Sequence, residues 1–297
     1  MAQLFYAPAY VCAGYSFDTT RKAGWIASSL GDRPIPGIAL REPLPLTREQ
    51  VVQVHDDAYV RAVETGSPRE LAESQGFDWD AALWRMVLAS NGGVVAAALA
   101  ALAGGVAGSL SSGLHHARHA RGAGFCTFNG LVLAANAAIA AGARAVMILD
   151  LDAHCGGGTE SLVAADPRVW QFDVSVCAFD RYPATERARL EIARDGATYM
   201  AAVARALDAA GGCGVRFDLC LYNAGMDPFE GCATGGAPGV TRDLLAERER
   251  LVFDWCRARR LPVAFALAGG YVGDRLDEAG LVDLHRLTLA AAAGTAT

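Results

Sequence analysis

The clearest candidates for chemistry lie in the segment AVMILDLDAHCGGG, residues 145–158. An apolar run typical of a buried strand ends there in Asp150, Asp152 and His154, which occupy alternate positions. Alternate residues of an extended chain project to the same side. Carboxylate and imidazole groups gathered at one strand end can share a divalent metal ion, so the segment predicts a metal site.

A third ligand candidate, Asp227, follows a second apolar run. With Asp152 and His154 it offers two carboxylates and one imidazole. Three protein ligands with a position left for water are typical of a catalytic zinc ion, whereas structural zinc sites have four protein ligands. Iron(II) can bind the same ligands. Asp150 is either a further ligand or a partner that supports the ligands.

Two adjacent histidines, His115 and His116, follow another apolar run. Beside a metal ion, one of them can take a proton from water and return it to a leaving group. Tyr271 follows the flexible pair Gly269–Gly270 and can donate a hydrogen bond to a carbonyl oxygen that becomes negatively charged. The three side chains predict proton transfer and oxyanion stabilisation beside the metal.

The remaining reactive residue types are interpreted as structural. The CGGG run at 155–158 is not followed by GK[ST], so it does not indicate nucleotide binding. Cys155 projects away from the candidate ligands and is expected to be a packed thiol. His55, His119 and His285 lie in ordinary amphipathic or surface contexts. The eight cysteines are scattered without a CxxC pair, which predicts reduced thiols.

The elements that position these residues are predicted to be parallel strands with helices between them. Continuous apolar strands of this kind favour a sheet covered on both faces. The carboxyl ends of such strands share one edge, where ligands bind. The Pro-rich stretch 31–46 is expected to be an irregular connection, and residues 1–297 are expected to form one α/β domain. Strand-like runs lie at 105–114, 144–152, 168–176, 217–225 and 261–270, and helical stretches at 81–103, 128–141 and 241–260.

Composition restricts the class of protein. The chain has 297 residues, 53% of them hydrophobic, so it can bury a sizeable core. Its net charge of -6 argues against a nucleic-acid partner. The longest uncharged stretch, VVAAALAALAGGVAGSLSSGL, predicts a buried helix followed by a strand rather than a membrane span. No secretory signal is evident, so we expect a cytoplasmic protein. No feature of the sequence indicates an oligomeric state.

Four segments together resemble the zinc-dependent histone deacetylases, closest to their class IV branch and to compact bacterial homologues. The resemblance covers about residues 17 to 273, because FDTTRKAGW and VHDDAYV also resemble that branch. The blocks come in the family's order and spacing. They are GLHHARHARGAGFCTFNGLVLAA, ILDLDAHCGGGTESL, LYNAGMDPFEG and AGGY.

The resemblance implies the arginase/deacetylase fold, a three-layer α/β/α sandwich around a mostly parallel, eight-stranded sheet. By motif position, Asp152, His154 and Asp227 would hold the zinc ion. Asp150 matches the carboxylate that pairs with the first histidine. With the strand end near Ser175, it would also contribute to a buried potassium site.

The resemblance also implies roles around the metal. His115 and His116 match the tandem histidines, with His116 as general base and acid. Tyr271 would polarise the acyl carbonyl. Gly124 and Phe125 match positions that line the acyl-lysine channel.

Several positions depart from the family pattern. Family members usually carry Asp or Asn at the position of Gly157, where it orients the second histidine. A water molecule or another residue would have to replace it here. Cys155, Thr127, Gly130 and Cys232 stand where His or Gln, Tyr, Asp and Asp are usual. These departures concern rate and substrate more than the class of reaction.

We therefore expect a zinc amidohydrolase that removes acetyl or longer acyl groups from N-ε-acyl-lysine. One alternative substrate is a small acylated amine such as an acetylpolyamine. An arginase-like ureohydrolase would normally need a further aspartate at the position of Gly156. A non-catalytic binding protein would be expected to have lost Tyr271 or a ligand, and the sequence has all of them.

Overall fold

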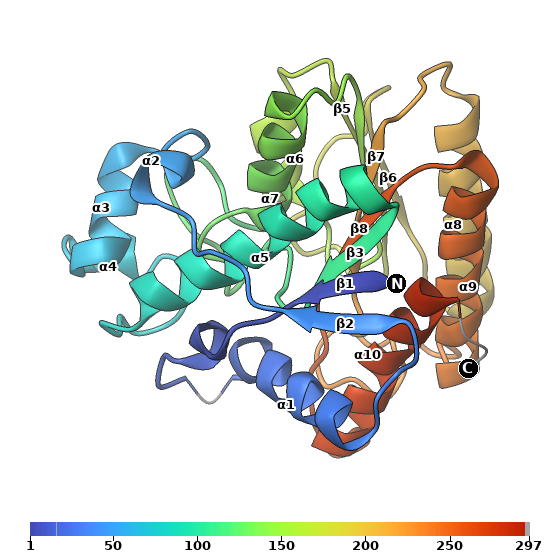
Figure 1. Cartoon of the computed structure of the whole chain (residues 1–297), viewed down its shortest axis with the longest axis horizontal. Coiled ribbons are helices and arrows are strands. Elements are labelled where there is room, and N and C mark those ends of the chain that lie inside the picture. The colour runs from blue at the N-terminus through green and yellow to red at the C-terminus, as the bar shows by residue number, and fades with distance from the viewer. Residues whose placement is uncertain (16, 295–297) are drawn as a thin grey trace.

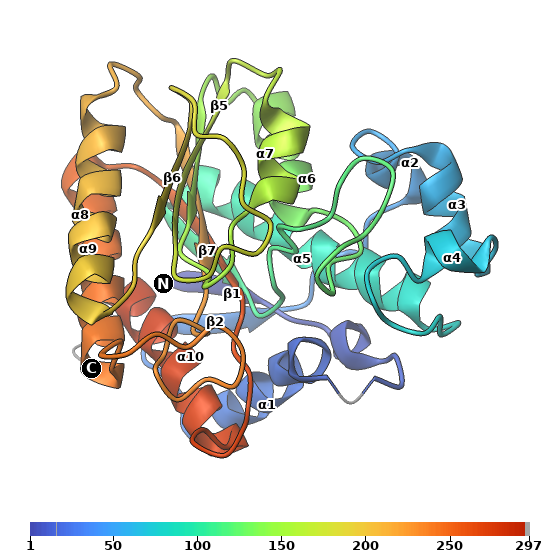
Figure 2. The same cartoon turned by 180° about the vertical axis from the view of Figure 1, so that it is seen from behind.

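The computed structural model of the chain describes residues 1–15 and 17–294. In this part, eight strands form one sheet in which every neighbouring pair is parallel, in the order β2-β1-β3-β8-β7-β4-β5-β6. Helices cover both faces (Figures 1 and 2). The predicted three-layer α/β/α sandwich is therefore confirmed.

The strands are β1 (Ala2–Phe5), β2 (Ile38–Arg41), β3 (Val106–Ser109), β4 (Val146–Asp150), β5 (Val169–Ser175), β6 (Ala188–Ile192), β7 (Leu219–Ala224) and β8 (Val263–Leu267). The helices are η1 (Pro8–Val11, a 3-10 helix), α1 (Asp18–Asp32), α2 (Arg48–Val51), α3 (Asp57–Thr65), α4 (Arg69–Ala72), α5 (Leu83–Gly104), α6 (Gly130–Ala140), α7 (Gly157–Val163), α8 (Gly196–Gly212), α9 (Arg242–Arg259) and α10 (Glu278–Ala293). Short helices α2 to α4 lie to one side, near the start of α5 (Figure 1).

Two hydrophobic cores lie on the two faces of the sheet. One face of β4 contributes Met147 and Leu149 to a core shared with α1, α8, α9 and α10. Its other face contributes Val146 and Ile148 to a core shared with α3, α5 and α6. Alternate side chains of a strand point to opposite faces, so a continuous apolar run is what a doubly covered strand requires.

Each of the five predicted strand runs contains a strand, and each of the three helical stretches corresponds to α5, α6 or α9. The prediction for residues 31–46 was wrong, because β2 lies there and pairs with β1. As an edge strand with Leu40 and Arg41 exposed, β2 lacks the buried run by which the five predicted strands are recognised. The single domain over residues 1–297 stays a prediction, and residues 16 and 295–297 lie outside the described part.

Helix α5 is long and apolar enough to span a membrane, but 61% of the residues in its most apolar window are buried inside the protein. It packs against α6 and β3 and is followed directly by that strand. Among the described residues it is the one helix that meets these length and composition criteria. The predicted buried helix followed by a strand is confirmed.

The strand register sets the position of the candidate site. Asp150 at the end of β4 lies opposite Asn223 of β7, which lies opposite Ala266 of β8. Ala266 in turn pairs with Ser109, the last residue of β3. The segments that follow these four strands therefore emerge side by side at one edge of the sheet, as parallel pairing requires.

A buried ion pair braces the strand end that carries the candidate ligands. Arg248 of α9 is fully buried and donates to Glu249 through Nη2 (2.6 Å) and to the hydroxyl of Tyr199 through Nη1 (2.8 Å). Nη1 also donates to the carbonyl of Leu151 (3.3 Å), between the two aspartates of the DLD segment. Tyr222 donates to the same Glu249 oxygen (2.7 Å). Helix α9 is thus fixed to the end of β4 by charged hydrogen bonds.

We expect Arg248→Ala to lower the free energy of unfolding by about 3–5 kcal/mol, because it leaves the charge of Glu249 buried without its partner. Arg205→Ala removes an exposed ion pair with Glu191 and should cost less than about 1 kcal/mol. Urea unfolding of the three proteins, followed by circular dichroism, measures both differences. Equal losses in the two variants would contradict a bracing role for the buried pair.

Candidate active site

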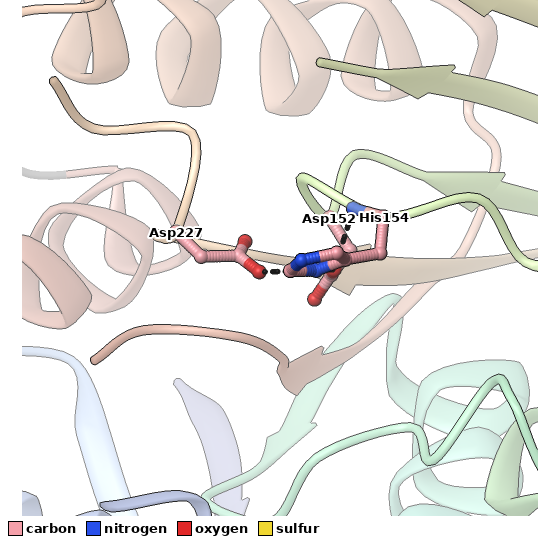
Figure 3. Close-up of side chains that lie close together, drawn as sticks. All are labelled: Asp152, His154 and Asp227. Atoms are coloured by element: carbon pink, nitrogen blue, oxygen red, sulfur yellow. Dashed lines mark hydrogen bonds and ion pairs between the residues drawn. The ribbon is translucent and has the colours of Figure 1, made fainter. Parts of the chain in front are cut away.

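Three candidate metal ligands converge at the common edge of the sheet. Asp152 and His154 follow β4 and Asp227 follows β7, and their donor atoms all lie within 4.8 Å of one another. Nδ1 of His154 lies 3.1 Å from Oδ1 of Asp152 and 3.2 Å from Oδ2 of Asp227 (Figure 3). Both carboxylates are buried. The three side chains point at one small volume between them.

The charges of this set fit a divalent cation. Burial and the charge of Asp152 raise the pKa of Asp227 to about 6. Burial disfavours a charged His154, but its hydrogen bonds with Asp152 and Asp227 outweigh this and raise its pKa to about 11. A proton on His154 therefore compensates the two carboxylates in the protein alone. Two carboxylates and a histidine suit zinc or iron(II), which would displace that proton on binding.

Backbone amides fix the carboxylates in place. The N–H of Ala153 donates to Oδ1 of Asp227 (2.9 Å), and the N–H of Gly269 donates to Oδ2 of Asp152 (2.8 Å). Glycine is required at residue 269, because a Cβ atom there would lie 2.1 Å from Oδ2 of Asp227. Such supporting hydrogen bonds hold ligands in position before an ion binds.

Asp150 lies beside the triad and pairs with the first tandem histidine. Its Oδ2 lies 2.7 Å from Nδ1 of His115, and its Oδ1 accepts from the amide of Asn223 (2.8 Å). Burial disfavours a charged His115, but Asp150 and Asp152 outweigh it and raise its pKa to about 10. His115 therefore carries a proton at neutral pH.

The second histidine, His116, is neutral where the first is charged. The ring of His116 lies 3.9 Å from that of His115, centre to centre. Burial and the charge of His115 lower the pKa of His116 to about 4, although its hydrogen bond to Asp180 works in the other direction. Nδ1 of His116 donates to Oδ2 of Asp180 (3.0 Å). His116 is thus neutral at pH 7, and Nε2 is the nitrogen left to accept a proton.

The segment between the tandem histidines and α6 is held from two sides. Asn129 caps α6 through Oδ1 and donates through Nδ2 to the carbonyls of His115 (3.3 Å) and Ala117 (3.2 Å). His55 binds the carbonyl of Arg118 through Nδ1 (2.9 Å) and accepts from the N–H of Asn129 at Nε2 (2.9 Å). His55 therefore connects the two ends of the loop that carries Gly124 and Phe125.

The predicted channel residues occupy unusual backbone conformations. Gly124 and Phe125 both have positive φ, 51° and 64°. Residue 124 touches the site, because a Cβ atom there would lie 2.5 Å from the ring of His116. The ring of Phe125 is 37% exposed and packs against Phe17, 4.3 Å away between ring centres. A non-glycine residue seldom adopts positive φ, so this geometry is imposed by the fold.

Tyr271 follows the Gly269–Gly270 pair after β8 and is half-buried. Its ring lies 5.3 Å from Phe17, centre to centre. Burial and the nearby carboxylates of Asp227 and Asp152 raise the pKa of its hydroxyl well above the usual value. The phenol therefore remains a hydrogen-bond donor across the physiological pH range.

The predicted potassium position contains a carboxylate that sequence reasoning missed. Ser175 ends β5 and donates to Oδ1 of Asp173 (2.6 Å), and both side chains are buried. Oδ2 of Asp173 accepts from the N–H of Gly156 (2.7 Å). Burial and the charge of Asp150 raise the pKa of Asp173 to about 8. A potassium ion near Ser175 stays a prediction.

Three further residues at the site were also missed. Phe179 is 49% exposed, and its ring meets the rings of His116 and His154 edge to face, 5.0 and 6.1 Å away. Asp180 follows it. Both lie in the loop after β5, so the rule that ligands bind at strand ends could have drawn attention to them.

Lys22 of α1 is buried and donates to the carbonyl of Ala268, directly before Gly269. Burial lowers its pKa to about 8, although the charges of Asp227 and Asp152 act to raise it.

Comparison with known proteins gives the family. A profile of the histone deacetylase domain matches residues 19–283. The chain belongs to the histone deacetylase family. Members of this family are metal-dependent hydrolases of amide bonds, and deacetylase activity follows for this chain. The family recognised from the sequence motifs is confirmed.

Individual relatives agree with the family assignment. An uncharacterized protein of Picosynechococcus sp. is 33% identical over 73% of this chain and 74% of its own length. Histone deacetylase 2 of Arabidopsis thaliana is 28% identical over 79% of this chain, and the match spans 64% of its length.

Two solved structures share the fold. The HD domain of HDA15 has a TM-score of 0.81 at 19% identity, covering 99% of this chain and 90% of that one. The acetylpolyamine aminohydrolase of Burkholderia pseudomallei has a TM-score of 0.78 at 20% identity, covering 98% of each chain.

For this deacetylase-family protein we expect about one divalent ion per chain, since three ligands form one catalytic-type site. Asp227→Asn should lower zinc affinity by more than about 100-fold, because losing only a supporting partner already costs about 10–100-fold. Asp218→Asn, at the start of β7 and paired with Arg144, should leave affinity unchanged. Elemental analysis after dialysis and titration against a competing chelator measure both. An Asp227→Asn protein that retains its ion would contradict the ligand assignment.

Proposed function

We propose that this protein is a zinc-dependent or iron(II)-dependent deacylase of N-ε-acyl-lysine side chains in peptides or proteins, with Asp152, His154 and Asp227 as metal ligands. The observation that carries the choice of substrate is the pair of exposed aromatic rings beside the site. Phe179 packs on His116, and Phe125 adjoins Gly124, which touches the same histidine. Aromatic faces bind the uncharged methylene chain of an acylated lysine.

The reaction divides among a few side chains. A bound divalent ion would polarise the acyl carbonyl and make water more acidic. His116, neutral at pH 7, accepts the proton of the attacking water at Nε2 and then delivers it to the departing amine. Tyr271 keeps its proton and donates a hydrogen bond to the carbonyl oxygen as negative charge develops. Asp150 raises the pKa of His115 against the effect of burial, and burial together with the charge of His115 lowers the pKa of His116.

A charged substrate such as an acetylpolyamine is less well matched. Its remaining amines are protonated and would call for free carboxylates along the approach. The carboxylate next to Phe179 is Asp180, and its charge is already paired with Arg118 and hydrogen-bonded to His116. The overall net charge of -6 would favour a cation only through long-range attraction. An arginase-like site is not supported, because one three-ligand cluster is present in the described residues.

Leu114, which directly precedes the tandem histidines, and Phe125 of the predicted channel line a small cavity together with Thr127. Its volume is about 40 Å³, and we infer that it receives the acyl group. Pockets for drug-sized ligands measure about 300 Å³ or more, so this cavity has no room for a fatty acyl chain. We therefore propose acetyl-lysine as the preferred substrate over myristoyl-lysine.

The purified, zinc-loaded protein should hydrolyse an acetyl-lysine peptide with a higher kcat/KM than the matched myristoyl-lysine peptide. His116→Ala should lower kcat by about 100-fold or more, the usual loss when a general base is removed. His119→Ala, an exposed histidine of the same segment, should retain wild-type activity. Release of the free lysine peptide, followed by chromatography, measures all three rates.

Other outcomes would change the assignment. Faster turnover of an N-acetylated polyamine than of either peptide would contradict the acyl-lysine proposal while leaving the deacetylase activity in place. A preference for the myristoylated peptide would show that the cavity opens to admit a long chain, against the proposed specificity. Equal activity of His116→Ala and wild type would contradict the role of His116.

A further inference from the structure

We propose that Asp180 is the positioning residue of His116, supplied from the loop after β5 in place of a side chain at residue 157. This inference rests on the proposed role of His116 as general base. Asp180 would take over the task of the Asp or Asn that family members usually carry at the position of Gly157. Asp180 comes from a different segment of the chain, 23 residues beyond Gly157.

Three contacts fix the direction of the Asp180 carboxylate. Oδ2 accepts from Nδ1 of His116 (3.0 Å) and from the N–H of Gly158 (3.0 Å), and Oδ1 pairs with Arg118. The side chain of Asp180 is 9% exposed. Burial disfavours its charged form, but the hydrogen bond from His116 and the charge of Arg118 outweigh this and lower its pKa. Asp180 is therefore a fixed, ionised acceptor for the Nδ1 proton.

A side chain at residue 157 and Asp180 in its present place exclude each other. A Cβ atom on Gly157 would lie 2.2 Å from the carbonyl oxygen of Asp180 and 2.7 Å from its Oδ1. A side chain at residue 157 could thus be accommodated only if the loop moved away. Gly157 therefore does more than lack an orienting side chain, because its missing Cβ atom leaves the space that Asp180 occupies.

Backbone hydrogen bonds fix the loop after β5 so that Asp180 lies beside His116. The N–H groups of Val176 and Cys177 both donate to the carbonyl of Ala153, at 2.9 and 2.8 Å. The N–H of Cys155 donates to the carbonyl of Phe179 (3.0 Å). Asp180 itself has a φ of 59°, a left-handed conformation that costs energy for a residue other than glycine. The surrounding hydrogen bonds hold the residue in this conformation, which directs the carboxylate at His116.

Asp180 does not touch the reacting atoms, so it acts through His116. With Nδ1–H bound to a carboxylate, the neutral imidazole keeps its lone pair on Nε2, where the base function requires it. The same loop places Phe179 against the His116 ring. The base is therefore oriented by the segment that also forms part of the substrate approach.

The test compares Asp180→Ala, Asp180→Asn, Arg118→Ala and Arg181→Ala in the zinc-loaded protein. Asp180→Ala should lower kcat by about 10–100-fold, as loss of an outer partner does, with KM within about twofold of wild type. Asp180→Asn keeps a neutral acceptor of the same shape and should fall between wild type and Asp180→Ala. Arg118→Ala should show a smaller loss than Asp180→Ala. Arg181→Ala removes an exposed charge of the same loop and should match wild type.

A second readout does not depend on turnover. In proton–nitrogen spectra of the zinc-loaded protein labelled at histidine, the Nδ1–H signal of His116 should be present in wild type and Arg118→Ala and absent in Asp180→Ala. The signal is assigned by its loss in His116→Ala. Melting temperatures and zinc content establish that the variants are folded and loaded.

Two results would overturn the inference. One is a loss in Arg118→Ala as large as that in Asp180→Ala, which would make Asp180 only an anchor for the arginine. The other is an unchanged Nδ1–H signal in Asp180→Ala. If wild type fails to deacylate any lysine peptide while the signal depends on Asp180, the proposed substrate fails and the pairing stands.

Discussion

The site depends on two buried carboxylates that face one imidazole nitrogen. Asp152 and Asp227 lie with Nδ1 of His154 between them, and burying like charges so close is costly without a cation. Backbone amides of Ala153 and Gly269 meet the remaining oxygens, and Gly269 allows the approach. The metal requirement of the family thus has a physical counterpart in this chain, because the triad is a fixed cluster of negative charge that a divalent ion would neutralise.

Nearby negative charge also separates the charge states of two adjacent histidines. His115 lies against Asp150 and holds its proton, whereas His116 is buried next to that charge and stays neutral. Identical side chains with neighbouring positions in the sequence therefore have pKa values several units apart because their partners differ. Such a division is how one site keeps a proton donor and a proton acceptor available at one pH.

Much of the fold and of the site could be predicted from the sequence. Continuous apolar runs identify doubly covered parallel strands, and the polar residues that follow them must meet at one edge, so Asp152, His154 and Asp227 are recognisable from their positions in the chain. Edge strand β2 could not be found, because half-exposed residues carry no burial pattern. Asp180 could not be assigned to His116, because the contact joins residues 64 apart and depends on a left-handed turn in a loop. Periodicity predicts strands and helices but does not predict the path of a loop.

We propose that amide hydrolysis by this protein needs one metal ion, bound in this three-ligand site, and no second ion. The most direct test removes metal with a chelator and restores Zn²⁺ stepwise while deacetylation of an acetyl-lysine peptide is measured. We expect no activity in the metal-free protein and a linear return that is complete at about one equivalent. Activity that survives complete metal removal, or that needs two equivalents, would contradict the account.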